Sequence, residues 1–544
     1  MRLTELKLPL DHAADDLPAA IVRRLGIAPA ELVAYSIYRR SYDARKPAAI
    51  FLIYTLDVEL TDEVAVLVRL RDDPHVGPTP DTRYRFVAAP TQLPTQPPTQ
   101  PSAPRPLVVG TGPCGLFAGL ILAQMGLRPL ILERGKAVRE RTRDTWDFWR
   151  QRRLNPESNV QFGEGGAGTF SDGKLYSQVR DPEYRGRKVL SEFVKAGAPE
   201  EILYVAKPHI GTFRLVAMVE NLRATIESLG GEFRFDSRVD DVCIEAGRVR
   251  GVSLADGAFI AADRLVLAIG HSARDTFEML HRRGVHMEAK PFSIGVRIEH
   301  PQSLIDRARF GKHAGHPLLG AADYKLVHHA RNQRSAYSFC MCPGGTVVAA
   351  ASEPGRLVTN GMSQYSRNER NANSAIVVGI TPADYPARHP GDPLAGIEFQ
   401  RHWEARAFAA GGGNYDAPAQ RLGDFLAGRP STALGAVLPS YTPGVKPTDL
   451  TTCLPDFVTE TLREAIPAFE RAIRGFAMDD ALLTGIETRT SSPLRITRGE
   501  DGQSLNVRGL FPAGEGAGYA GGILSAGIDG IRAAETVARS LASD

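Results

Sequence analysis

The stretch PLVVGTGPCGLFAGLILAQMGLRPLILERG, residues 106–135, decides the fold of this chain. Its apolar run 107–109 is bounded by turn-forming residues, which predicts a short buried strand. Gly110, Gly112 and Gly115 follow in G-x-G-x-x-G spacing, and an apolar helical pattern comes directly after them. A second apolar run then ends in an acidic residue. This order predicts one βαβ unit of a dinucleotide-binding fold.

Each part of this unit has a role in holding a dinucleotide. Gly110 allows the tight turn, Gly112 lets the backbone approach a pyrophosphate, and Gly115 lets helix and strand pack closely. The start of the helix offers free N–H groups and a positive dipole end to the phosphates. Glu133, 23 residues after Gly110, is placed to accept hydrogen bonds from ribose hydroxyls. These residues leave NAD and FAD as alternatives.

The composition of the whole chain narrows the class of protein. Its 544 residues are enough for two or three domains. A formal net charge of +3 gives no field that demands nucleic acid or an acidic membrane. Five cysteines do not make a disulfide framework, and no apolar run has the length of a signal peptide core or a membrane span. We expect a cytoplasmic protein without a membrane partner.

A tract rich in Pro, Gln and Thr, residues 90–106, divides the chain and predicts an extended linker. Before it, residues 1–89 show strand patterns and one helical pattern, which predict a small α+β module of ferredoxin-like type. After it, we expect a nucleotide-binding domain in two parts, 107–290 and 491–544. An inserted α+β substrate domain, 291–490, separates these two parts.

The C-terminal stretch GLFPAGEGAGYAGGI, residues 509–523, distinguishes between the two nucleotides. Gly514-Glu515 follows an apolar run, and Gly521-Gly522-Ile523 opens a long helical pattern. Together with the glycine triplet, ERG at 133–135 and LAIG at 267–270, this order resembles FAD enzymes of the glutathione-reductase structural superfamily. Glu515 stands where many relatives have Asp.

Three further motifs narrow the resemblance. They are NVQFGEGGAGTFSDGKLYS (159–177), SFCMCPGGTVVAAASEPGRLVTNGMS (338–363) and GGGNYDAPAQRLGDFL (411–426). With RRSYDARK in the N-terminal module, they are similar to the bacterial family called uncharacterised FAD-dependent dehydrogenases. The resemblance covers nearly the whole chain, but the family name describes a cofactor and gives no substrate.

The resemblance implies an α/β fold with a Rossmann-like FAD-binding domain, and it implies which residues contact FAD. The start of the C-terminal helix would lie near the flavin ring, where its dipole stabilises negative charge on reduced flavin. The residues that the resemblance places against FAD are Gly110, Gly112, Gly115, Glu133, Arg134, Gly270, Gly514, Glu515, Gly522 and Ile523.

The chain shows no second G-x-G-x-x-G with its strand and acid, which departs from NADPH-using disulfide reductases. This departure suggests that the inserted domain, 291–490, covers the flavin and holds a small-molecule substrate. NAD(P)H remains open as a transient electron donor.

The loop 163–174, GEGGAGTFSDGK, is dense in glycine and polar residues. Its glycines would let backbone N–H groups approach the flavin, and Ser171, Asp172 and Lys174 would face the substrate. The alternative is a surface turn with solvated charges. We favour the functional role, because loops on rigid scaffolds carry sites.

Cys340 and Cys342 form a C-x-C pair. A thiolate pair near flavin could carry electrons or bind a soft metal. However, alternation along a strand puts both on one face, where Cys packs as a small hydrophobe. Two cysteines are too few for a closed zinc site, so we expect no metal. We expect structural thiols, a flavin that takes two electrons, and turnover that survives replacement of both cysteines by serine.

Several other polar residues are candidates for proton donation or substrate binding. His271, or His328-His329, could donate a proton, although a hydrogen-bonded surface histidine is the simpler interpretation. The family-like motifs contain polar residues that could bind a substrate, namely Asn360, Ser363, Asn414 and Tyr415. The segment YSIYRRSYDARK, residues 35–46, interleaves aromatic and basic residues as an RNA-binding strand would. We favour an amphipathic strand with a solvated basic face, so we do not expect nucleic acid as a partner.

These patterns together predict an FAD-dependent oxidoreductase that exchanges a hydride between flavin N5 and a small organic substrate. Two alternatives stay open. One is a flavin-dependent RNA-modifying enzyme that binds RNA through its N-terminal module, and the other is a non-catalytic flavin-binding regulator. RNA binding would weaken steeply with salt, and a regulator would hold FAD without turning over any electron donor.

Overall fold

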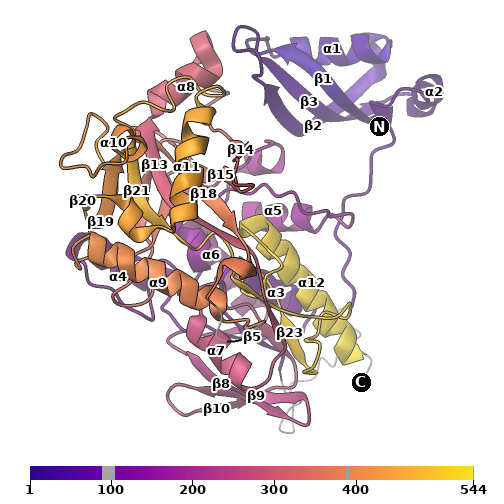
Figure 1. Ribbon diagram of the computed structural model, residues 1–544. Helices are drawn as coiled ribbons and strands as arrows, with labels where there is room; N and C mark the ends of the chain where they lie inside the picture. Colours follow the sequence, from indigo (N-terminus) through magenta and orange to yellow (C-terminus); the bar gives the residue numbers. More distant parts are fainter. Residues whose placement is uncertain (89–104, 387–388, 390, 543–544) are drawn as a thin grey trace.

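The computed structural model describes residues 1–88, 105–386, 389 and 391–542, which form three units (Figure 1). Of the tract expected to be a linker, 90–106, all but the last two residues lie outside the described residues. The predicted α/β fold with a nucleotide-binding parallel sheet is confirmed.

The N-terminal unit has the element order βαββαβ and one antiparallel sheet in the order β2-β3-β1-β4. This is the ferredoxin-like arrangement that the sequence suggested. The first helix ends at Gly26, which adopts the left-handed conformation (φ +62°) expected of a glycine after a helix. The elements are β1 (Arg2–Pro9), α1 (Asp16–Leu25), β2 (Leu32–Asp43), β3 (Phe51–Leu60), α2 (Glu63–Arg69) and β4 (Val76–Gly77).

The second unit is built on a five-stranded parallel sheet in the order β23-β11-β5-β6-β7. Numbered in sequence and read from β7, this is 3-2-1-4-5, the strand order of a doubly wound nucleotide-binding fold. Four of these short strands are apolar and buried because both faces are covered, whereas the edge strand β7 is partly exposed and carries two charged residues. They are β5 (Leu107–Val109), β6 (Leu130–Leu132), β7 (Glu232–Arg234), β11 (Leu265–Leu267) and β23 (Leu510–Pro512).

Helices α3 and α12 lie side by side in this unit (Figure 1). Their contact is close because α12 has a glycine, Gly530, where it faces α3. A Cβ added at Gly530 would stand 2.1 Å from the Cys114 carbonyl oxygen. An antiparallel meander, β8-β9-β10, lies between β7 and β11 in the sequence. The other elements of the unit are α3 (Pro113–Gln124), α4 (Val138–Gln151), η3 (Gly166–Phe170), α5 (Arg185–Lys195), η4 (Glu200–Leu203), α6 (Thr212–Ser228), β8 (Val239–Glu245), β9 (Arg248–Leu254), β10 (Phe259–Ala261), α7 (Arg274–Arg282) and α12 (Ile523–Ala542).

The third unit is inserted between β11 and β23 and contains a seven-stranded mixed sheet in the order β14-β15-β18-β13-β21-β19-β20. Helix α11 packs on β14, β15 and β18, and α9 packs on β19 and β21. A pair, β12 with β22, connects the unit to the nucleotide-binding unit. The elements are β12 (Met287–Ala289), β13 (Phe292–Pro301), α8 (Gln302–Phe310), β14 (Val327–His329), β15 (Ser335–Cys342), β16 (Gly345–Ala349), β17 (Thr359–Ser363), β18 (Asn371–Ile380), α9 (Ala395–Ala410), β19 (Ala417–Arg421), α10 (Leu422–Leu426), β20 (Val445–Pro447), α11 (Asp456–Phe469), β21 (Leu482–Glu487) and β22 (Leu494–Ile496).

The N-terminal unit is fastened to the other two. The backbone N–H of Arg40 donates to the Tyr204 carbonyl (2.6 Å), and the N–H of Ala206 donates back to the Arg40 carbonyl (2.9 Å). The ring of Tyr42 meets the ring of Phe310 edge-on at 5.8 Å between centroids. One apolar cluster runs from the N-terminal unit into the inserted unit. The segment 35–46 is therefore partly an interface strand, because β2 pairs and packs here.

Among the described residues, no helix has the length and apolar character that crossing a membrane requires.

Candidate functional site

The carboxyl ends of β5 and β11 and the start of α12 carry glycines with open space beside them. A Cβ added at Gly112 would have its nearest neighbour, the Gly166 Cα, at 3.8 Å. A Cβ at Gly270 or Gly522 would meet no atom within 4 Å. These three glycines leave room for a ligand at the edge of the sheet where nucleotides bind in this kind of fold.

The other two glycines of the triplet are required by the packing of the backbone around them. A Cβ at Gly110 would stand 2.3 Å from the Ala268 carbonyl oxygen, and one at Gly115 would stand 1.8 Å from the Gly110 carbonyl oxygen. Gly110 also has a positive φ of 100°. Gly110 and Gly115 therefore let the turn and the helix close, and only Gly112 of the three faces free space.

Two helix N-termini and the glycine-rich loop meet at this edge. A Cβ added at Gly168, in η3, would stand 3.0 Å from Ile523 Cγ1 and 3.6 Å from Pro113 Cγ. Pro113 opens α3 and Ile523 opens α12. The positive ends of two helix dipoles and the unpaired N–H groups of their first turns thus converge beside the loop.

Glu515 lies partly buried next to this junction. The Ser492 N–H donates to its Oε1 at 3.3 Å, and a Cβ at Gly521 would stand 3.6 Å from its Oε2. Burial raises the pKa of Glu515 to about 7, although the charge of Lys290 opposes the rise. Its neighbour Gly514 (φ +73°) donates its N–H to Asp529 at 2.7 Å. The site therefore contains a carboxyl group that can hold or release a proton near neutral pH.

Glu133 holds three loops together. Its Oε2 accepts from the N–H (2.9 Å) and hydroxyl (2.6 Å) of Thr111, and its Oε1 accepts from the N–H groups of Gly135 (2.9 Å) and Gly163 (3.0 Å). All four acceptor positions of the carboxylate are used. A ribose hydroxyl would have to replace one of these donors. Arg134 is turned to Glu157 and Asp275 in ion pairs of 2.9 Å each.

The loop residues singled out in the sequence occupy three different environments. The Ser171 hydroxyl donates to the Gly168 carbonyl at 2.7 Å. Asp172 is buried and accepts a hydrogen bond from Arg367 Nε at 3.0 Å. Lys174 stands 3.5 Å from the Asp172 carboxylate and donates to the backbone carbonyl of Met341 in β15. The loop thus links the edge of the nucleotide-binding sheet to the inserted unit.

The expectation that Cys340 and Cys342 alternate along a regular strand is wrong. Pairing of β15 with β18 is regular only as far as Phe339 and shifts before Cys342, so the strand has a bulge. Cys340 itself has a positive φ of 44°, and its carbonyl accepts from Arg297 Nη1 at 2.9 Å. Its surroundings are charged, because Lys174 reaches the next carbonyl along the strand.

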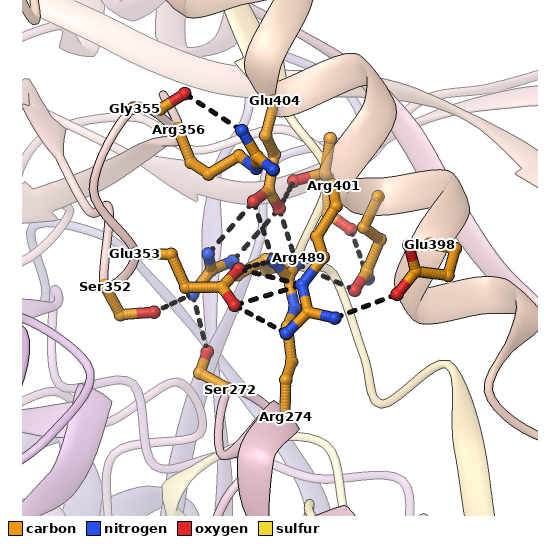
Figure 2. Close-up of polar contacts among 12 residues, drawn as sticks. Ser272, Arg274, Ser352, Glu353, Gly355, Arg356, Glu398, Arg401, Glu404 and Arg489 are labelled. Atoms are coloured by element: carbon orange, nitrogen blue, oxygen red, sulfur yellow. Dashed lines mark hydrogen bonds and ion pairs between the residues drawn. The ribbon is translucent and has the colours of Figure 1, made fainter. Parts of the chain in front are cut away.

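A buried network of arginine and glutamate joins the nucleotide-binding unit to the inserted unit (Figure 2). Glu404 of α9 accepts from Arg274 of α7 (2.7 and 2.9 Å) and from Arg489 after β21 (3.1 and 3.2 Å). Arg489 also donates to Ser272 and Ser352 at 3.0 and 2.6 Å. We call Arg274, Glu404 and Arg489 the interdomain ion network. It fixes the loop after β11, which contains Gly270, against the inserted unit.

The remaining candidates have structural partners. Burial, together with the charges of Arg489 and Arg274, lowers the pKa of His271 to about 3, so its ring is neutral and is a poor proton donor. His328 lies 3.2 Å from Glu464, and His329 lies 2.8 Å from the Ser335 hydroxyl. The family-like polar residues bond as follows: Asn360 to Arg297, Ser363 to the Pro343 carbonyl, Asn414 to Asp416, and Tyr415 to the Gly355 N–H.

Sequence reasoning missed Arg297, Arg367, Glu487 and the interdomain ion network. One signal was present: Arg297 and Glu299 interrupt the apolar run FSIGVRIEH, and charged residues inside a buried strand require partners. Among the described residues, no group of three or more His, Cys, Asp or Glu is arranged to hold a metal ion.

Two family models match the chain. One, described as "FAD-dependent protein, C-terminal domain-like", matches residues 291–490, and a domain of unknown function matches residues 1–59. An uncharacterized protein of Clostridium beijerinckii is 47% identical over 538 residues, which covers 99% of this chain and 98% of that protein.

Two solved structures show a distant likeness. The halogenase PltM matches with a TM-score of 0.39 at 13% identity, over 80% of this chain and 70% of that one. The L-proline dehydrogenase from P. horikoshii matches with a TM-score of 0.36 at 11% identity, over 81% of this chain and 95% of that one. Likeness of this degree carries no argument about the reaction.

Proposed function

This chain belongs to one family with the Clostridium beijerinckii protein and carries an FAD-dependent C-terminal domain, so FAD is its cofactor, and we propose that it is an oxidoreductase of a small organic substrate. When bound, FAD supplies a hydride acceptor or donor at flavin N5. The substrate would lie between the nucleotide-binding unit and the inserted unit.

The observation that carries this proposal is the convergence at Gly168, where η3 touches the first residues of both α3 and α12. Two helix N-termini beside a glycine-rich loop form a site for a pyrophosphate and for developing negative charge. The open space at Gly112, Gly270 and Gly522 fits a ligand that approaches the backbone closely. The residues present therefore fit FAD.

The chain's own residues would do three things in the reaction. The starts of α3 and α12 would bind the phosphates and stabilise negative charge through their dipoles. Glu515 would hold a proton close to the start of α12, because its pKa of about 7 allows both protonation states. The inserted unit, held in place by the interdomain ion network, would exclude water and orient the substrate.

The proposal is tested by anaerobic reduction of the purified full chain with NADH, NADPH and dithionite, followed by re-oxidation with quinone, disulfide and conjugated carbonyl acceptors. We expect the bound flavin to be reduced by about two electrons and to be re-oxidised repeatedly by at least one organic acceptor. Flavin absorbance at each step is the readout. A protein that holds FAD but cycles with no donor and acceptor pair would instead be a flavin-binding regulator.

Replacement of Glu515 by glutamine is expected to remove a pH dependence of stability. The folded-state pKa of about 7 lies above the ordinary 4.5, so this group stabilises the fold below its ordinary pKa and loses that contribution as pH rises through about 7. The flavin-free variant should therefore be more stable than the flavin-free parent at alkaline pH, by up to ~3 kcal/mol. Their free energies of unfolding should converge toward acid pH.

Urea unfolding of both proteins across the pH range measures this difference. Glu500→Gln, at an exposed loop position, is the matched control and should track the parent. Parallel curves for Glu515→Gln and the parent would show that Glu515 titrates as an ordinary carboxyl group.

A further inference from the structure

The bulge in β15 places Cys340 in a strained and polar position. Its left-handed backbone (φ +44°) is uncommon for a residue other than glycine. Its carbonyl accepts hydrogen bonds from Arg297 Nη1 at 2.9 Å and from the Cys342 thiol at 3.3 Å. Bulges and strained residues of this kind gather where a strand has to re-aim a functional side chain.

Charged side chains from the nucleotide-binding unit and from the inserted unit surround the bulge. Lys174 comes from the glycine-rich loop and donates to the Met341 carbonyl, between the two cysteines. Asp172 of the same loop pairs with Arg367. On the other side, Arg297 of β13 pairs with Glu487 of β21 through two hydrogen bonds of 2.9 and 3.1 Å. We call these five residues, with Cys340 and Cys342, the Cys340 cluster.

The fixed charges of the Cys340 cluster do not balance. Its three cations are Lys174, Arg297 and Arg367, whose side chains are 18%, 0% and 14% exposed. Its two carboxylates are Asp172 and Glu487, 1% and 4% exposed. One positive charge is left over, and an uncompensated charge away from water costs several kcal/mol or more. A thiolate at Cys340 would complete the balance.

The remaining titratable groups that face the cluster add no net charge. Burial lowers the pKa of His209, so this ring is neutral. Burial raises the pKa of Tyr176 and of Tyr324, so both phenols keep their protons. Asp323 is paired with Lys207 at 2.8 Å.

The two thiols are unequal. The neighbouring Cys342 thiol, followed by the charges of Lys174 and Arg297, lowers the pKa of Cys340 well below its ordinary value, against the effect of burial. The pKa of Cys342 moves in the opposite direction, because of Cys340 and of burial. Cys340 is also partly exposed, whereas Cys342 is buried. The partly exposed Cys340 sulfur is therefore the one suited to attack, while the buried Cys342 thiol donates its proton to the Cys340 carbonyl.

We propose that Cys340 is a thiolate nucleophile that forms a covalent adduct with a small conjugated carbonyl compound at the junction of the glycine-rich loop and β15. In this step the sulfur lone pair forms an S–C bond to the β-carbon, and the π electrons of the C=C bond move toward the α-carbon and the carbonyl oxygen. A proton from water then completes the α-carbon. The Lys174 ammonium supplies positive charge where the oxygen gains negative charge.

The experiment is reaction of the full, FAD-loaded chain with N-ethylmaleimide, a conjugated dicarbonyl, from about pH 5 to about pH 9, followed by peptide mass spectrometry. Cys243, the other partly exposed cysteine, is the internal reference. We expect Cys340 to react about tenfold or more faster than Cys243 at mildly acid pH. We also expect the Cys340 rate to level off while the Cys243 rate still rises with pH.

Variants separate an activated thiolate from a thiol that is merely reachable. Cys340→Ser should lose the fast site, and Cys342→Ser should keep it with a higher pH midpoint. Lys174→Met should slow Cys340 about tenfold at mildly acid pH, whereas Lys174→Arg, which keeps the charge, should restore the rate. Lys195→Met, at a largely exposed lysine, is the matched control. The flavin absorbance and circular dichroism report whether each variant is folded.

A Cys340 rate that follows that of Cys243 at every pH, or one that Lys174→Met leaves unchanged, would overturn the proposal. Labelling of Cys243 with none at Cys340 would overturn it as well. These readouts do not involve electron transfer, so the result is distinguishable from failure of the proposed oxidoreductase function.

Discussion

A Gly112→Val variant is expected to be folded and colourless, with FAD binding weakened by about 100-fold or more. An added Cβ here would have only the Gly166 Cα within reach, at 3.8 Å, so the protein itself tolerates the side chain. Gly112 also has an ordinary φ of −66°, which valine adopts without strain. The branched side chain would instead occupy the space through which a pyrophosphate approaches the start of α3.

The measurement is the FAD content of the purified variant, together with titration of added FAD and a thermal unfolding curve without cofactor. Gly77→Val is the matched control, because an added Cβ at Gly77 meets nothing within 4 Å and Gly77 lies in the N-terminal unit. Gly110→Val and Gly115→Val should fail differently, by loss of folded protein, since their added atoms overlap backbone. A yellow Gly112→Val protein with one FAD per chain would show that the cofactor lies elsewhere.

A Glu404→Ala variant is expected to lose about 3–5 kcal/mol of unfolding free energy. Glu404 is fully buried and is the carboxylate shared by Arg274 and Arg489 (Figure 2). Its removal leaves two guanidinium groups away from water with too little negative charge between them. Urea unfolding measures the loss, and Glu460→Ala, at an exposed position of α11, is the matched control and should change stability by less than ~1 kcal/mol.

Glu404 is also expected to make the stability of the fold fall at acid pH. Although burial opposes ionisation, the charges of Arg274 and Arg489 hold the pKa of Glu404 well below its ordinary value. A lowered folded-state pKa stabilises above the unfolded value, and this contribution is lost as pH falls. The parent should therefore lose stability more steeply in acid than Glu404→Gln does. An unfolding free energy for Glu404→Ala within ~1 kcal/mol of the parent would contradict the role of this network.

The nucleotide-binding part of the fold could be predicted because its signals are local. The tight turn at Gly110, the space beside Gly112 and the helix after them depend on residues only a few positions apart. The helix ending at Gly26 and the Rossmann-like unit follow from the same kind of short-range pattern. The identity of the cofactor also followed from short motifs at the two ends of the nucleotide-binding unit.

The Cys340 cluster could not be predicted in the same way. Lys174, Arg297 and Arg367 come from distant positions in the sequence, and only the pairing of β13, β15 and β18 brings their neighbourhoods together. The bulge at Cys340 contains no glycine or proline from which it could have been predicted. Glu133 shows a different limit: its spacing predicted a ribose acceptor, but spacing does not reveal the four hydrogen bonds that the carboxylate already accepts.

The strand order of the nucleotide-binding sheet determines when, during synthesis of the chain, the cofactor site can form. Strand β11 lies between β5 and β23, yet β23 and α12 follow every other described element in the sequence. The N-terminal unit and much of the inserted unit can begin to fold earlier. The cofactor site at the start of α12 can form only after these elements are made, so cofactor capture would mark chains that have been made to the end of α12.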